Sequence, residues 1–331
     1  MNSDTLACSV EKNAAQSLLP NLVIAGAPKS GTSSLFRWLA DHPEVLGSSV
    51  KETYYFVDPG THMHNAKCHY ATRGLEGYRD FFPAQRVSPK LVLEATPSYL
   101  YSETALRELP RLPSAPHFIF LLREPVEQIH SAFRYFQGNW GWISPEMKFE
   151  GFVESCATGA NSFGGNELAR NALRNAAYAN FLLRWREACG DDRIHIFLFE
   201  EVFADKRGFM QRLATTFGID PSFYNAYDFP AENQTYGVRS RALQKVNLAV
   251  RGLLPQGALY RAARTFYRKL NTEAGGIRLD PAFARQLAKK YEMANEQLAR
   301  EFTLDLEPWA AIARARATQV ADAGDTVHGV D

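Results

Sequence analysis

The chain has 331 residues, of which 46% are hydrophobic and 22% are charged. This composition is typical of a globular protein with its own core, and it excludes a disordered, collagen-like or fibrous chain. Lysine and arginine number 37 against 36 for aspartate and glutamate, giving a net charge of +1. Dedicated nucleic-acid-binding proteins are usually more basic, so we expect no nucleic-acid partner.

Cysteine usage and hydropathy bear on the compartment. The four cysteines are scattered without a CxxC pair, at Cys8, Cys68, Cys156 and Cys189. This spacing favours reduced thiols over a disulfide framework. No run approaches the roughly 18 apolar residues that cross a bilayer, and the first residues lack the pattern of a secretory leader. The sequence predicts a cytoplasmic protein without a membrane partner and leaves its oligomeric state open.

Apolar runs and helical patterns alternate along the chain. Continuous apolar runs predict strands buried on both faces of a parallel sheet at residues 22–25, 91–93, 117–122 and 194–198. Helical patterns cover residues 34–40 and 166–188. The alternation predicts a doubly wound, P-loop-like α/β fold with mainly parallel central strands, flanking helices, and helical and loop insertions.

No Gly/Ser-rich linker divides the chain. We therefore expect one elaborated domain over residues 21–312. Residues 1–20 are polar, and the end of the chain is small and polar, so flexible segments are expected at 1–20 and 313–331.

The segment after the first predicted strand contains a candidate anion site. Its loop and the first turn of the following helix supply Lys29, Ser30, Gly31, Thr32, Ser33 and Ser34. Backbone N–H groups and the helix dipole converge there, so an anion, phosphate in particular, is expected to bind. The loop differs from a Walker A loop because Thr32 stands where the nucleotide-gripping lysine would be. No acidic strand end is paired with it for Mg²⁺, which disfavours metal-assisted phosphoryl transfer.

The predicted strand at 117–122 leads to a second candidate anion site. Arg123 follows this strand directly, and the helix after it presents Ser131 in its second turn. Carboxyl ends of parallel strands meet at one edge, where open α/β sheets bind ligands. An arginine there is a competent anion clamp, although a structural ion pair is the alternative for Arg123.

The segment 27–35 resembles the 5′-phosphosulfate loop of sulfotransferases that use 3′-phosphoadenosine 5′-phosphosulfate (PAPS). The likeness extends in separate motifs over most of residues 21–310 and is nearest to the bacterial and heparan-type branches. It implies that Lys29 and residues 30–34 bind the 5′-phosphosulfate and that Arg123 and Ser131 bind the 3′-phosphate. It also implies that a late loop containing Arg239 closes over the nucleotide, whereas a basic surface loop is the alternative.

The acceptor must lose a proton, and the resemblance offers several bases. Residues 51–56 resemble the family's KExxxF segment, in which the glutamate, here Glu52, is the proposed base. A carboxylate on a partly buried strand has the raised pKa that this task needs. Glu94 lies in a segment similar to the family's acceptor region and is a second candidate. Ala95 stands where heparan-type members often carry lysine, which weakens any transfer of polysaccharide specificity.

Two further segments bear on the acceptor and on metals. His62, His64, Cys68 and His69 match no standard zinc spacing, so we expect no metal. A histidine from this loop, His62 or His64, is the family's other kind of base. Residues 134–165 are rich in aromatic side chains, Tyr135 and Trp140 among them, which suits either a packed loop or the wall of an acceptor pocket.

The resemblance implies a PAPS-dependent sulfotransferase. Such an enzyme moves the sulfuryl group by in-line displacement to a hydroxyl or amine of a small-molecule or carbohydrate acceptor, releases 3′,5′-ADP, and needs no metal. The aromatic segment favours a small cyclic or natural-product acceptor. Two alternatives stay open: a P-loop kinase that uses Mg²⁺-ATP, and a nucleotide-binding protein without activity.

Overall fold

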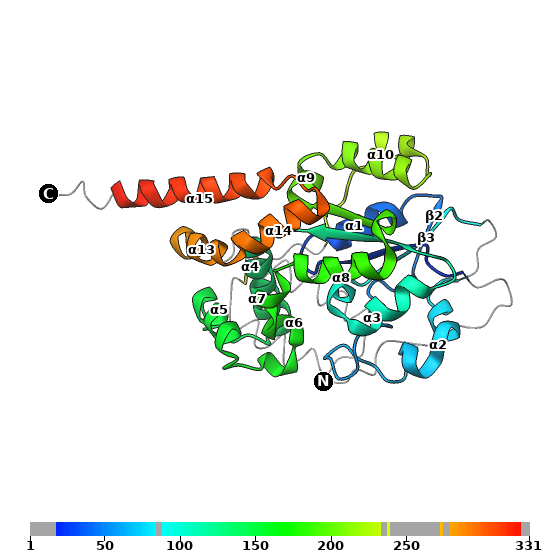
Figure 1. Ribbon diagram of the computed structural model, residues 1–331, viewed down its shortest axis with the longest axis horizontal. Helices are drawn as coiled ribbons and strands as arrows, with labels where there is room; N and C mark the ends of the chain where they lie inside the picture. The colour runs from blue at the N-terminus through cyan, green and yellow to red at the C-terminus, as the bar shows by residue number, and fades with distance from the viewer. Residues whose placement is uncertain (1–17, 84–87, 233–236, 239–271, 274–278, 326–331) are drawn as a thin grey trace.

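The computed structural model describes residues 18–83, 88–232, 237–238, 272–273 and 279–325 (Figure 1). A parallel sheet of five strands has the order β2-β3-β1-β4-β5. The strands are β1 (Leu22–Gly26), β2 (Val45–Gly47), β3 (Leu91–Ala95), β4 (His117–Leu122) and β5 (Ile194–Leu198). The predicted fold class is confirmed, as are the four predicted strands, whereas the short β2 was not anticipated.

Helices cover both faces of the sheet (Figure 1). The α-helices are α1 (Thr32–Ala40), α2 (Tyr70–Arg79), α3 (Glu103–Glu108), α4 (Pro125–Tyr135), α5 (Phe149–Thr158), α6 (Glu167–Arg170), α7 (Ala172–Asn175), α8 (Ala179–Cys189), α9 (Phe199–Ala204), α10 (Lys206–Thr216), α13 (Pro281–Ala288), α14 (Glu292–Phe302) and α15 (Glu307–Asp325). Shorter turns are η1 (Pro97–Tyr101), η2 (Leu109–Arg111), η3 (Phe136–Trp140), η4 (Phe163–Gly165), η5 (Asp191–Arg193), η6 (Pro221–Asn225) and η7 (Lys289–Tyr291). A separate antiparallel pair joins β6 (Gly237–Val238) to β7 (Thr272–Glu273).

Alternate residues of each strand point into different cores. Ile24 and Ile119 pack against α1 and α10 on one face. Val23 and Phe118 belong to the core on the other face, which contains Trp185 of α8. Burying a large apolar side chain stabilises the fold by about 1.5–3 kcal/mol, so these two layers hold the carboxyl edge of the sheet in place.

A third core lies beside the sheet and explains the aromatic segment at 134–165. Phe149, Phe152 and Phe163 are buried in it with helices α4, α5, α7 and α13. Tyr135 and Trp142 of the same segment line a pocket. The segment is therefore both a packed unit and a pocket wall, so each of the two interpretations describes part of it.

The helix predicted over residues 166–188 is wrong in its continuity. The structure has α6, α7 and α8 in its place. Asn166 caps α6 by accepting a hydrogen bond from the Ala169 N–H at 2.9 Å, and Asn171 separates α6 from α7. Asparagine side chains compete with helical hydrogen bonds and favour helix ends, which outweighed the apolar pattern.

The end of the chain also differs from the expectation. Helix α15 continues to Asp325, where a flexible tail was expected from residue 313. Trp309 and Arg316 anchor this helix and are 4% and 6% exposed. Two buried anchors outweigh the small, polar composition of the segment. The predicted flexibility of residues 1–17 and 326–331 lies outside the described residues.

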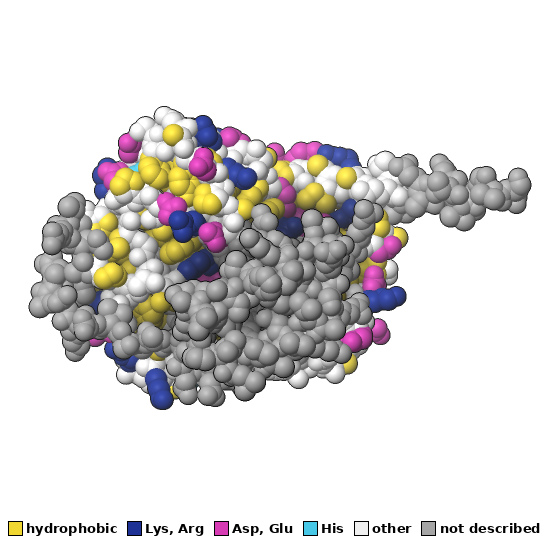
Figure 2. Space-filling view, turned by 180° about the vertical axis from the view of Figure 1, so that it is seen from behind, with side chains coloured by type: hydrophobic (Ala, Val, Ile, Leu, Met, Phe, Trp, Pro, Cys, Tyr) yellow, Lys and Arg dark blue, Asp and Glu magenta, His cyan; other side chains and the backbone are white. Residues whose placement is uncertain are grey.

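The described surface shows no segregation of charge on the face in Figure 2, where basic and acidic side chains are interspersed. None of the helices within the described ranges has the length and apolar character needed to cross a membrane.

Candidate active site

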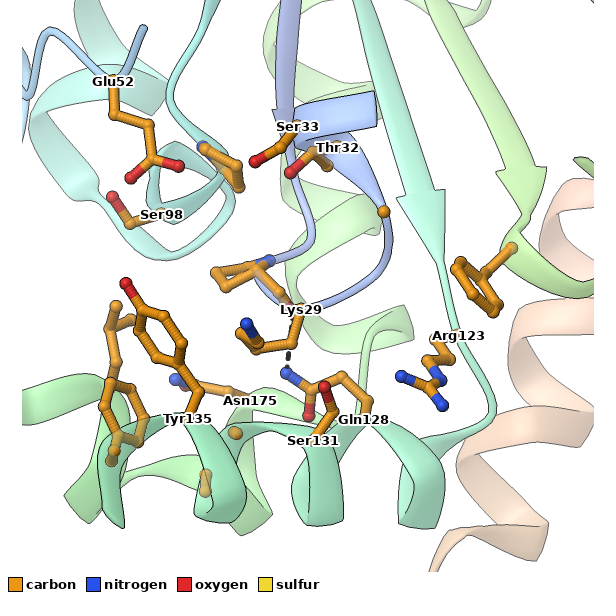
Figure 3. Close-up of a pocket in the computed structure, with 18 of the residues that line it drawn as sticks. Lys29, Thr32, Ser33, Glu52, Ser98, Arg123, Gln128, Ser131, Tyr135 and Asn175 are labelled. Atoms are coloured by element: carbon orange, nitrogen blue, oxygen red, sulfur yellow. Dashed lines mark hydrogen bonds between the residues drawn. The ribbon is translucent and has the colours of Figure 1, made fainter. Parts of the chain in front are cut away.

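A cavity of about 440 Å³ opens at the carboxyl edge of the sheet (Figure 3). The loop after β1, the loop after β2, η1 and helix α4 contribute to its wall. The structure places these predicted site residues in that wall: Lys29, Gly31, Thr32, Ser33, Ser34, Glu52, His62, Arg123, Ser131 and Tyr135. In Figure 3, Lys29 lies between Glu52 and Arg123. The two candidate anion sites therefore share one cavity.

Gly31 shapes the loop after β1. It is the N-cap of α1 with a φ of 86°, in the left-handed region that favours glycine. A Cβ atom there would lie 2.6 Å from the Phe203 ring. No side chain caps α1, and its first turn holds no acidic residue. Ser30 is buried, and its Oγ lacks a hydrogen-bond partner among the described residues. The positive end of α1 is thus open to an anion.

Lys29 is a half-buried cation in the loop after β1. Its Nζ lies 3.8 Å from the centre of the Tyr135 ring, a cation–π contact. Burial lowers the pKa of Lys29 to about 8 against the opposing effect of Glu52, and Arg123 lowers it further. None of the described carboxylates forms an ion pair with it. An anion in the cavity would therefore find this charge uncommitted.

Arg123 leaves β4 at the opposite side of the cavity from Glu52 (Figure 3). Its guanidinium lies 4.8 Å from the centre of the Phe199 ring and donates to Glu127 Oε2 at 3.3 Å. Helix α4 is tied to the loop after β1, because Gln128 Nε2 donates to the Pro28 carbonyl at 3.0 Å. Arg123 therefore forms an ion pair and also lines the cavity, and its role as an anion clamp stays a prediction.

Glu52 differs from the expectation in its location and in the direction of its pKa. It lies in the loop after β2 with a φ of 65°, not on a strand. Burial raises the pKa of Glu52, but Lys51, Tyr54 and Lys29 together lower it below its usual value. Lys51 Nζ lies 2.5 Å from Glu52 Oε1, and the Tyr54 hydroxyl donates to the other oxygen. Glu52 is consequently an ionised carboxylate at neutral pH.

Glu94 does not line the cavity, and its role as a second candidate base stays a prediction. Its side chain is fully buried at the end of β3, where Oε1 accepts from Thr96 at 2.6 Å and Thr53 at 3.1 Å. Oε2 has no partner among the described residues. Burial raises the pKa of Glu94 to about 7. The apolar run of β3 carries this carboxyl into the core, where it braces the loop after β2.

We expect the free energy of unfolding of the unaltered protein to fall relative to that of Glu94→Gln as pH rises. The pKa of Glu94 is raised from 4.5 to about 7. The stability contributed by its protonated form is therefore full below pH 4.5 and is lost as pH rises through 7. A shift of this size corresponds to about 3 kcal/mol at most. Urea unfolding of both proteins at pH 5 and pH 8 measures the difference. A constant difference would contradict the assignment.

The two histidines separate in the structure. His62 lines the cavity, and its Nδ1 lies 2.7 Å from Glu167 Oε2. His64 packs against His69, with 4.7 Å between the ring centres, and is absent from the cavity wall. The predicted role of His64 as a substrate contact stays a prediction. Across the described residues, no group of three or more His, Cys, Asp or Glu side chains is arranged to hold a metal.

Two predicted residues cannot be placed. Arg239 and the side chain of Trp140 lie outside what the structure describes. Other wall residues escaped the sequence analysis, namely Tyr54, Ser98, Tyr101, Gln128, Trp142 and Asn175. Gln128 precedes Ser131 by three positions on a helix, and that spacing puts both on one face. Ser98 lies in the segment 94–99, which resembles the family's acceptor region, whereas Asn175 had no such signal and is brought to the cavity by the fold.

The parallel sheet, the loop after β1 and the cavity at the carboxyl edge define a P-loop-like α/β protein. The sulfotransferase domain family matches residues 19–243. The chain belongs to this family. The predicted resemblance is thus confirmed.

Several known proteins are similar to this chain. Heparan sulfate glucosamine 3-O-sulfotransferase 6 of Homo sapiens is 27% identical over 262 residues, which cover 76% of this chain and 70% of that protein. Membrane-associated sulfotransferase kil1 of Dictyostelium discoideum is 35% identical over 120 residues. The crystal structure of a sulfotransferase from Alicyclobacillus acidocaldarius superimposes with a TM-score of 0.64 at 18% identity, covering 88% of this chain and 99% of that one. This last likeness shows the fold.

For two of the relatives, the match covers less than a quarter of the relative's own length. The match to kil1 covers 35% of this chain and 23% of that protein. The match to bifunctional heparan sulfate N-deacetylase/N-sulfotransferase 3 of Mus musculus covers 50% of this chain and 18% of that protein.

Proposed function

We propose that the chain transfers the sulfuryl group of PAPS to a hydroxyl or amine of an acceptor bound in the same cavity. The observation that carries the proposal is one cavity wall holding the uncommitted cation of Lys29, the open end of α1, Arg123, and the ionised Glu52. Family membership supports the choice of sulfuryl over phosphoryl transfer.

The wall suits a nucleotide with phosphate groups at both ends of its ribose. Lys29 and the N–H groups of residues 31–33 would hold the 5′-phosphosulfate, since the N–H groups of Ser30 and Ser34 already donate to backbone carbonyls. Arg123 with Ser131 would hold the 3′-phosphate. The orphan Ser30 Oγ and the uncommitted Lys29 are the groups that such anions would satisfy. PAPS supplies the sulfuryl group, and the wall residues supply charge and orientation.

In-line displacement forms a bond from the acceptor oxygen or nitrogen to sulfur and breaks the bond from sulfur to the bridging phosphate oxygen. Lys29 would neutralise the negative charge that grows on the leaving phosphate. Preorganised donors of this kind need no rearrangement as charge develops. Glu52 would accept the proton that the acceptor loses. The chain's own part therefore needs two charged side chains in their ionised forms.

The acceptor proposed for this site is a small, neutral, cyclic alcohol of the kind found among natural products. Apolar side chains make much of the wall away from Arg123: Met63, Tyr101, Phe136, Trp142, Leu168 and Ala172. Ser98 Oγ and Asn175 Oδ1 are buried polar atoms without partners among the described residues. A mainly apolar cavity with a few polar groups suits such a molecule. A polyanionic acceptor would require more cations than the described wall offers.

Transfer of labelled sulfate from PAPS tests the proposed reaction. The acceptor panel would contain neutral cyclic alcohols, phenols, amines and desulfated heparan oligosaccharides, all assayed in EDTA. Label in a neutral cyclic alcohol is the expected result. Label only in the oligosaccharide would overturn the acceptor class, and label in no acceptor would favour a nucleotide-binding protein without activity.

The pH profile should report Lys29. Its pKa is lowered to about 8, and a lysine is charged below its pKa. We therefore expect kcat/KM for PAPS, which reflects the free enzyme, to fall tenfold per pH unit above about pH 8. Initial rates at low PAPS between pH 6 and pH 10 measure this limb. A flat profile to pH 10 would show that Lys29 keeps its charge or has no part.

A further inference from the structure

The last helix of the chain reaches the candidate 3′-phosphate site through one buried arginine. Arg316 of α15 is 6% exposed. It donates from Nη1 to Glu124 Oε1 at 3.2 Å and from Nη2 to Glu124 Oε2 at 2.8 Å. Nη2 also donates to Glu127 Oε1 at 3.0 Å. Both carboxylates lie in the turn that follows Arg123. Helix α15 begins beyond residue 243, where the match to the family ends.

Glu127 is shared between two arginines. Its Oε1 accepts from Arg316, whereas its Oε2 accepts from Arg123 at the longer distance of 3.3 Å. A phosphate that binds Arg123 must therefore displace or repel this carboxylate. Arg316 gives Glu127 a second, shorter ion pair, so the cost to Glu127 of losing its contact with Arg123 is reduced.

Additional contacts fix the geometry of this turn. Glu124 caps α4 by accepting from the Glu127 N–H at 2.9 Å. The Glu124 N–H donates to Glu200 Oε1 at 3.0 Å, and Trp309 Nε1 donates to Glu200 Oε2 at 2.8 Å. Helix α15 therefore holds the turn at two points, through Arg316 and through Trp309.

We infer that Arg316 is a positioning residue that neutralises Glu127, so that Arg123 is free to pair with the 3′-phosphate. The inference rests on the proposed function, since it takes Arg123 as part of the nucleotide site. It assigns to α15 a part in nucleotide selectivity: the helix raises affinity for a nucleotide with a 3′-phosphate over one without it.

The preference for 3′,5′-ADP over 5′-AMP tests the inference. Calorimetry of the full chain gives both dissociation constants, and their ratio isolates the 3′-phosphate. In Arg316→Met we expect this ratio to fall on the order of tenfold, because Glu127 then competes for Arg123. Arg314→Met is the matched control. Arg314 lies on the same helix, is 63% exposed at its side chain and pairs with Glu307 at the surface, so its loss should leave the ratio unchanged.

A second substitution separates positioning from general damage. Glu127→Gln added to Arg316→Met removes the competing charge and should restore most of the preference. A merely structural role for Arg316 predicts no such rescue. Should Arg316→Met fail to fold, Glu127→Gln alone decides the matter. We expect it to keep or increase the preference, whereas a decrease would show that Glu127 is needed to hold Arg123 and would overturn the inference.

Failure of the proposed function would look different. In that case the unaltered chain itself would show no preference for 3′,5′-ADP over 5′-AMP. A clear preference in the unaltered chain that persists in Arg316→Met would overturn only the part assigned to α15.

Discussion

Lys29→Ala is expected to lower turnover by a factor on the order of 10² to 10³ with PAPS and any working acceptor. The side chain belongs to the loop after β1, and its Nζ lies 3.8 Å from the centre of the Tyr135 ring. In the proposed reaction its charge matters most when the bond from sulfur to the phosphate oxygen breaks. The loss should therefore fall mainly on kcat. Initial-rate kinetics at saturating PAPS measure it.

Lys90→Ala is a suitable control for the loss of a lysine. Lys90 forms an exposed ion pair with Glu44 at 2.6 Å and lies outside the cavity wall. Exposed pairs contribute little to stability, so this variant should turn over normally. A Lys29→Ala protein with near-normal turnover would remove Lys29 from the reaction.

Glu52→Gln is expected to lower turnover on the order of 10²-fold or more, while binding of 3′,5′-ADP changes little. The amide keeps the shape of the side chain and cannot take a proton from the acceptor. Because Lys51, Tyr54 and Lys29 hold the pKa of Glu52 below its usual value despite burial, the unaltered carboxylate is ionised at neutral pH. Single-turnover rates and calorimetry with 3′,5′-ADP separate chemistry from binding.

An unchanged rate in Glu52→Gln would transfer the role of base to another group. His62 is then the candidate, since it lines the cavity with its Nδ1 2.7 Å from Glu167. His64 and Glu94 come after it, because neither lines the cavity. His62→Gln would distinguish these outcomes: it should reduce turnover strongly only if His62 is the base.

Much of the fold was predictable because its signals are local. The buried strands β1, β3, β4 and β5 are continuous apolar runs, and such runs predict buried strands without knowledge of the rest of the fold. The strand β2 has three residues, too few for a pattern. The break after α6 falls at Asn171, whose side chain makes no capping hydrogen bond, so no local cap marks it. Helix α15 depends on Trp309 and Arg316 meeting partners more than 100 positions away.

Some residues of the candidate site were likewise predictable from local sequence, and others depend on the tertiary structure. Lys29, residues 31–34 and Arg123 follow strand ends directly, and parallel strands bring such ends to one edge. The pKa of Glu52 was predicted in the wrong direction, because it is set by Lys51, Tyr54 and Lys29 together with burial. Asn175 comes from a segment with no motif, whereas Ser98 comes from the segment that resembles the family's acceptor region. Sequence patterns thus located most of the groups proposed for the nucleotide, while tertiary packing brings further side chains to the part of the wall proposed for the acceptor.

Calorimetric titration with 3′,5′-ADP in EDTA tests most directly whether the two anion sites hold one nucleotide. The account predicts one molecule bound per chain, with the affinity falling sharply both in Lys29→Ala and in Arg123→Ala. Mg²⁺-ATP should bind more weakly. No heat with 3′,5′-ADP, or binding that survives both substitutions, would contradict it.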